Sequence, residues 1–147
     1  MKTIRLILLL AVAAGIWTTA RAADRAQVEG LLIVASSEPG QTDRRLAPYE
    51  ATLRRVLRFE SFKLLGSASG AVDTPGERTL TLGSGHELEV QASESDGKAI
   101  HVKVRWSANG RALMNTGLVL RAGVPAVLGG PSTGRPGEAY AVILIGR

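Results

Sequence analysis

Apolar and polar residues alternate along most of the chain after residue 27, which is typical of β-strands with one buried face. Gly, Pro, Ser or Asp residues separate these segments and predict turns between them. The last segment is apolar on both faces, so we expect it at the centre of a sheet that is covered on both sides. The predicted strands are 28–35, 59–65, 78–82, 86–92, 98–107, 112–121, 124–129 and 138–146.

One stretch has helical spacing instead. Tyr49, Leu53, Val56 and Leu57 recur at intervals of three and four residues, and Pro48 suits a first helical turn. The pattern predicts a helix over 47–58, with loops over 36–43 and 66–77. We therefore expect a mainly β (α+β) domain, an antiparallel sheet or β-sandwich with one packed helix near residues 47–58.

Three glycine-containing turns predict a four-stranded antiparallel meander from Arg78 to Arg121. Three-residue loops at 83–85, 95–97 and 108–110 keep apolar residues opposite apolar residues. The predicted pairs are Leu80 with Leu88, Thr79 with Glu89, Leu88 with Val104, Val90 with Val102, Ala92 with Ile100, Glu89 with Lys103, Glu87 with Arg105, Val104 with Met114 and Ile100 with Leu118. The core predicted from this alternation consists of Leu32, Val34, Leu53, Leu57, Phe62, Leu64, Leu80, Leu88, Val90, Val102, Val104, Trp106, Leu118, Leu120, Leu128, Val142 and Leu144.

The first residues have the pattern of a secretory signal. Lys2 and Arg5 precede an apolar run from Leu6 to Trp17, and Ala20-Arg21-Ala22 fits a cleavage site. We expect a signal peptide over 1–22 and one exported β-rich domain over 23–147, periplasmic or secreted. The run of about 12 residues is shorter than the roughly 20 that span a bilayer. An uncleaved anchor remains the alternative, and is the only membrane contact we expect.

Composition narrows the possible partners. The chain has no cysteine, so an exported domain must be held together by its core alone. Removal of Lys2, Arg5 and Arg21 with the signal would leave 15 basic against 13 acidic residues. No basic run is interleaved with aromatic residues, so we expect no nucleic-acid partner.

Few residues suggest chemistry. His86 and His101 are the only histidines and fall on opposite faces of the predicted sheet, with His86 facing Trp106, so we expect no metal site. The candidate carboxylates are Glu87, Glu89, Glu94 and Asp96, for which a solvated strand face is the simpler interpretation. The serines of 36–37 and 67–69 lie in small-residue segments without a nucleophile elbow. We expect no catalytic residue, no cofactor and no enzymatic activity.

The segment 129–137 is rich in glycine but lacks the lysine and the following helix of a phosphate-binding loop. It is longer than a hairpin turn requires. Two interpretations stay open, a flexible hairpin tip and a contact with a protein partner. The candidate contact residues are Gly129, Gly130, Pro131 and Arg135.

Two segments resemble known proteins. Residues 53–65, with Phe-Glu-Ser-Phe-Lys-Leu-Leu, resemble a pattern in small uncharacterised exported proteins of Gram-negative bacteria. Residues 115–131 and 140–145 are similar to the C-terminal sheet of bacterial secretins, although the proline-rich stretch that follows the two glycines there is absent. The chain is also too short for a channel wall with its periplasmic domains. The resemblance implies a β module or partner of an envelope complex and transfers no functional residue.

Together these observations predict a non-enzymatic periplasmic binding or assembly module, a component of an envelope or secretion complex with a protein partner there. A periplasmic protein that binds a small ligand is the alternative, and would need an apolar pocket with converging polar groups. A hydrolase is the third hypothesis, and would need a cleft that holds a histidine or a carboxylate pair.

Overall fold

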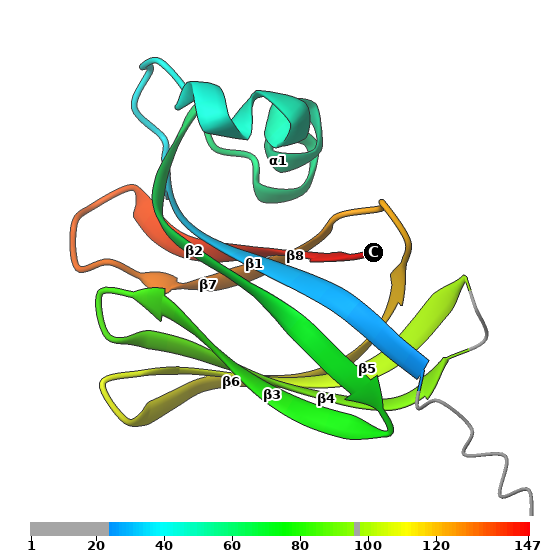
Figure 1. Cartoon of the computed structure of the whole chain (residues 1–147). Coiled ribbons are helices and arrows are strands. Elements are labelled where there is room, and N and C mark those ends of the chain that lie inside the picture. Colours follow the sequence, from blue (N-terminus) through cyan, green and yellow to red (C-terminus); the bar gives the residue numbers. More distant parts are fainter. Residues whose placement is uncertain (1–23, 96–97) are drawn as a thin grey trace, which may run out of the picture.

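The computed structural model describes residues 24–95 and 98–147. In these residues the chain forms two antiparallel four-stranded sheets that pack face to face (Figure 1). Sheet A has the order β2-β1-β8-β7 and sheet B the order β3-β4-β5-β6. A 3-10 helix, η1, and an α-helix, α1, follow β1. The elements are β1 (Asp24–Ser36), η1 (Arg44–Tyr49), α1 (Glu50–Leu57), β2 (Ser61–Thr74), β3 (Gly76–Gly83), β4 (His86–Ser95), β5 (Ala99–Ala108), β6 (Arg111–Arg121), β7 (Ala126–Ser132) and β8 (Glu138–Gly146).

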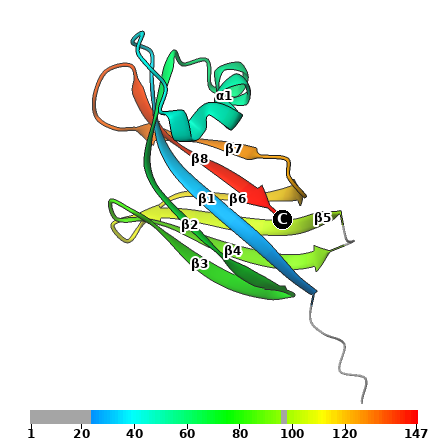
Figure 2. The same cartoon turned by 45° about the horizontal axis from the view of Figure 1, so that its top comes forward.

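The predicted mainly β fold with a packed helix is confirmed, in its sandwich form. The helices cover the outer face of sheet A, whereas no helix or strand of the described residues covers the outer face of sheet B (Figures 1 and 2). Side chains such as Leu32, Leu88 and Trp106 fill the space between the sheets. A second cluster, which includes Ile143 and Leu53, lies between sheet A and the helices. Strand β8 contributes to both clusters and is therefore central and covered on both sides, as predicted.

The helix begins differently from the prediction. Asp43 accepts a hydrogen bond from the backbone N–H of Arg45 at 3.0 Å and so caps η1, and Pro48 lies inside this 3-10 turn. The α-helix starts only at Glu50. Leu53 is buried as predicted, but half of the surface of Val56 is exposed, and Leu46 of η1 is buried instead. A 3-10 turn has 3.0 residues per turn rather than 3.6. It therefore changes which side of the helical segment faces the sheet, and a pattern with a period of 3.6 does not show this change.

The predicted strand over 59–65 is confirmed from Ser61 onward, but the predicted loop over 66–77 is wrong. Strand β2 runs unbroken through Ser61–Thr74 and pairs with β1 along its whole length. The small residues allow a close approach between sheets. A Cβ atom at Gly66 would collide with the carbonyl oxygen of Leu82, and one at Gly70 with the side chain of Arg78. The small-residue composition therefore reflects packing rather than a loop.

The meander is confirmed, and so are the pairs Leu80 with Leu88 and Thr79 with Glu89. The registers of the next two hairpins are wrong by two residues. The pairing at the turns differs from the predicted three-residue loops, with Ser95 opposite Ile100 and Ala108 opposite Arg111, and a β-bulge in each ladder shifts the register by one residue. A shift of two keeps every side chain on its predicted face. The observed pairs are Leu88 with Trp106, Val90 with Val104, Ala92 with Val102, Glu87 with Ser107, Glu89 with Arg105, Gln91 with Lys103, Val104 with Thr116, Trp106 with Met114 and Ile100 with Leu120.

Two predictions concern residues that are not described. The signal segment 1–22 lies outside the described ranges, as does Asp96 with its neighbour Gly97. Among the helices of the described residues, none combines the length and apolar character needed to cross a bilayer.

Candidate functional site

The structure divides the predicted partner contact between a strand and a turn. Gly129, Gly130 and Pro131 belong to β7, the edge strand of sheet A, and Arg135 lies in the turn that follows. A Cβ atom at Gly130 would overlap the ring of Trp106, so this glycine makes room for the core. Gly129 lies beneath Leu57 of α1. Pro131 and Arg135 are the exposed members of the set.

The turn 133–137 is held by its own hydrogen bonds. The Thr133 hydroxyl donates to a Glu138 carboxylate oxygen at 2.9 Å, and the backbone N–H of Glu138 donates to the carbonyl of Arg135 at 3.3 Å. The N–H of Gly134 donates to the Ser132 hydroxyl at 3.1 Å. This turn, hereafter the β7–β8 tip, is therefore held by internal hydrogen bonds and exposes Arg135 to solvent.

The tip is also tied to the segment that leads into the helices. Both the N–H and the hydroxyl of Ser37 donate to the carbonyl of Gly137, at 2.8 and 3.1 Å. Gly137 has a φ of 68°, a left-handed conformation that favours glycine, and a Cβ there would meet the Ser37 hydroxyl. The sequence analysis missed this link because Ser37 and Gly137 are 100 residues apart, and only the pairing of β1 with β8 brings them together.

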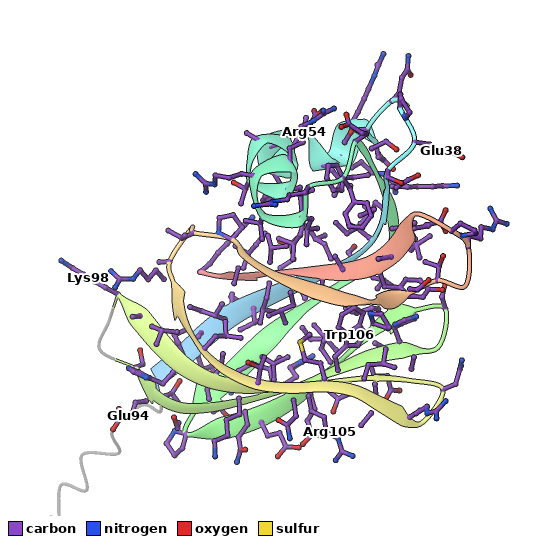
Figure 3. All side chains as sticks on the ribbon, turned by 180° about the vertical axis from the view of Figure 1, so that it is seen from behind. Glu38, Arg54, Glu94, Lys98, Arg105 and Trp106 are labelled. Carbon is purple, nitrogen blue, oxygen red and sulfur yellow. The ribbon has the colours of Figure 1, made fainter. Side chains whose placement is uncertain are left out.

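The helical segment 37–60 carries five arginines, two of which are ion-paired. Arg45 binds Asp43 at 2.7 Å, and these hydrogen bonds lower the pKa of Asp43 to about 2. Arg54 bridges Glu50 at 3.1 Å, and Figure 3 shows it on the helical layer with Glu38 on the loop nearby. The other three, Arg44, Arg55 and Arg58, have no ion pair among the described residues. The end of the molecule that holds the tip and the helices thus exposes unpaired cations.

The described candidate carboxylates, Glu87, Glu89 and Glu94, lie on the outer face of sheet B. Glu89 lies opposite Arg105, and Glu94 lies opposite His101 beside a bulge. The carboxyl of Glu89 is hydrogen-bonded to that of Glu77, which raises the pKa of Glu77. Glu77 was not among the predicted carboxylates, because it belongs to the segment 66–77 that was expected to be a loop. Shallow hollows of about 120 and 200 Å³ lie along this face. Figure 3 labels Arg105, which lines both of them.

His86 is a core residue with two aromatic neighbours. Only 4 % of its surface is exposed. Its Nδ1 accepts a hydrogen bond from Nε1 of Trp106 at 3.0 Å, and its ring lies 4.7 Å from that of Tyr140. Burial lowers the pKa of His86. The predicted pairing of His86 opposite Trp106 is wrong, because His86 lies opposite Ala108 and Trp106 opposite Leu88, and the two rings meet diagonally across the strands. In the described part of the chain, no three His, Asp or Glu side chains could hold a metal ion together.

A hollow of about 220 Å³ opens between the sheets where β1 and β5 begin and β8 ends. Ala26, Ala99 and Ile100 contribute its apolar surface, and Arg25, Lys98 and Arg147 contribute cationic side chains. Arg25 is paired with Asp73 at 3.0 Å and Arg147 with Glu29 at 3.6 Å. The hollow is smaller than the roughly 300–1,000 Å³ of typical ligand sites.

Comparison with known proteins assigns no family or function to the chain. No protein family, curated protein or solved structure matches the chain.

Proposed function

We propose that this protein is a non-enzymatic binding module of the bacterial cell envelope, exported by its N-terminal segment, which contacts a protein partner through the β7–β8 tip. The observation that carries the proposal is the construction of the tip. It is ordered by internal hydrogen bonds, anchored to Ser37, and exposes Arg135 without an ion pair among the described residues. A preorganised loop loses little conformational entropy when it binds.

The surroundings of the tip support an acidic partner surface. Arg44, Arg55 and Arg58 have no ion pair among the described residues, where they outnumber the one unpaired carboxylate of this segment, that of Glu38. Helix α1 overlies β7 at Gly129. Charges of one sign around a contact mainly raise the association rate and the selectivity for a partner of opposite sign.

The other two hypotheses receive less support. The end hollow is small, and two of its cations are already ion-paired. The carboxyl pair Glu77 and Glu89 lies on an open sheet face, whereas His86 is inside the core, so no cleft brings an acid and a histidine together there.

The test is photo-crosslinking of the full-length protein in its own cells. A photoreactive residue at position 135 should give a discrete adduct with one protein, whereas the same residue at position 103, on the outer face of sheet B, should not. Arg135→Glu should reduce recovery of that partner by about tenfold or more, because it reverses a contact charge. Lys103→Glu is the matched control and should retain the partner.

Both variants should fold, with melting temperatures that change by no more than a few degrees, since both side chains are exposed. Equal adducts from the two positions, or full recovery of the partner with Arg135→Glu, would show that the tip is only a hairpin end.

A further inference from the structure

The four edges of the two sheets are not equally protected. Strands β2 and β3 lie against each other, as the contact of Gly66 with Leu82 shows. Strand β7 is short, loses its register with β8 between Gly129 and Ser132, and contains Pro131. Strand β6 is 11 residues long, and its one register break lies beside the turn. Of the described strands, β6 is the long regular edge.

The edge of β6 lacks the features that normally block pairing with another chain. No proline and no charged residue lies between Arg111 and Arg121. Alternate residues of an edge strand direct their backbone N–H and C=O groups away from the sheet, where they are available to a further strand. Val119 on this strand is 45 % exposed and Val124, just after it, is 55 % exposed. Exposed apolar side chains beside unpaired backbone groups are typical of a strand-docking surface.

The charges at the ends of the strand indicate which occupant fits. Arg111 and Arg121 are exposed and have no ion pair among the described residues. They lie ten residues apart, a span of about 34 Å in an extended strand. Antiparallel pairing of two copies centred on Thr116 would place Arg111 opposite Arg121 of the other copy, which repulsion disfavours.

We propose that β6 is the docking edge for an extended segment of a different protein, with uncharged, alternately apolar residues over about nine positions and a carboxylate at each end. The segment adds a fifth strand to sheet B, and its carboxylates pair with Arg111 and Arg121. This assignment deepens the proposed binding function and rests on it, because it specifies the chemistry of a partner segment. It concerns a surface other than the tip.

The probe is a synthetic 11-residue peptide matched to the length of β6, with alternating valine and threonine and a glutamate at each end. Binding to the full-length protein is measured by fluorescence anisotropy. We expect this peptide to bind at least about tenfold more tightly than one with lysine at each end, and the difference to shrink at high salt. Hydrogen exchange of the β6 amides should slow when the glutamate peptide binds.

The double variant Arg111→Glu, Arg121→Glu should reverse the preference and select the lysine peptide. Arg135→Glu is the control and should bind the glutamate peptide as the unaltered protein does. Loss of the native partner with Arg135→Glu reports on the tip alone, so the two proposals fail separately.

Three results would overturn the assignment. One is absence of peptide binding, which would indicate that Arg111 and Arg121 prevent the edge of β6 from pairing with another strand. Another is a charge preference that the double variant leaves unchanged. The third is a concentration-dependent dimer with protected β6 amides, which would identify a second copy as the occupant.

Discussion

His86 and Trp106 form a polar contact inside an otherwise apolar core. The indole N–H donates to Nδ1 of His86, so the imidazole must be neutral, with its proton on Nε2. Protonation would place two donors face to face and bury a charge between the sheets. Both effects favour the neutral form, in agreement with the lowered pKa of His86.

This contact predicts a pH-dependent stability. His86 in the unfolded chain takes up a proton near its ordinary pKa of about 6.5, whereas folded His86 does so only at lower pH. The free energy of unfolding should therefore fall as the pH drops below about 6.5, by up to about 1.4 kcal/mol per pH unit, until the folded pKa is reached. Urea unfolding of the wild type between pH 7 and pH 5 measures this slope.

His86→Gln keeps a hydrogen-bond acceptor for Trp106 and removes the titration, so the slope should become smaller. An identical slope for the wild type and His86→Gln would contradict the assignment.

At the level of the elements, β2 shows how packing overrides composition. Its segment of Gly, Ser and Ala has little intrinsic preference for a strand. It forms one because β1 supplies the hydrogen bonds of a full-length ladder and because the neighbouring sheet leaves no room for side chains. A sequence pattern can show that residues are small, but not that another strand lies against them.

Two glycines in strands test this explanation as a matched pair. A Cβ at Gly66 would collide with the Leu82 carbonyl, whereas the nearest atom to a Cβ at Gly117 is 3.9 Å away. Gly66→Ala should destabilise the protein by about 2–4 kcal/mol, because β2 and β3 must separate. Gly117→Ala should be neutral or stabilising by up to about 1 kcal/mol, since alanine loses less backbone freedom on folding. Equal melting temperatures for the two variants would rule out close packing as the reason for Gly66.

For the whole molecule, the sandwich gives the two faces of sheet B different environments. Val104 lies between the sheets, and 1 % of its surface is exposed. Lys103 lies on the outer face, opposite Gln91 and Gly117. With no disulfide available, the stability of the sandwich depends on the two hydrophobic clusters on either side of sheet A.

The layers predict contrasting effects at adjacent positions. Val104→Asp should destabilise by several kcal/mol, enough to lower the melting temperature by about 10 °C or more, because it buries an unpaired charge. Lys103→Glu should cost less than about 1 kcal/mol, mainly through repulsion with Glu89 across the solvated face. Thermal melts followed by circular dichroism measure both, and similar shifts would contradict the face assignment.

The alternation of apolar and polar residues determined the strands of the meander, the central position of 138–146 and the face of nearly every core residue. These features depend on side chains that alternate between the two faces with a period of two. A register error of two residues therefore leaves each side chain on its predicted face. The predicted core did not include Leu31 and Ile33, which pack in the cluster beside the helices, because alternation along 28–35 cannot show that the second face of that strand is covered. It also left out Ile143 and Ile145, although 138–146 was expected to be covered on both faces.

Only the tertiary structure decided the extent of β2, the link of Ser37 to Gly137 and the role of Gly130 beside Trp106. Each depends on a contact between residues far apart in the chain, so no local spacing encodes it. The open edge of β6 is likewise a property of strand order, since the sequence of a strand does not state whether one neighbour or two will pair with it.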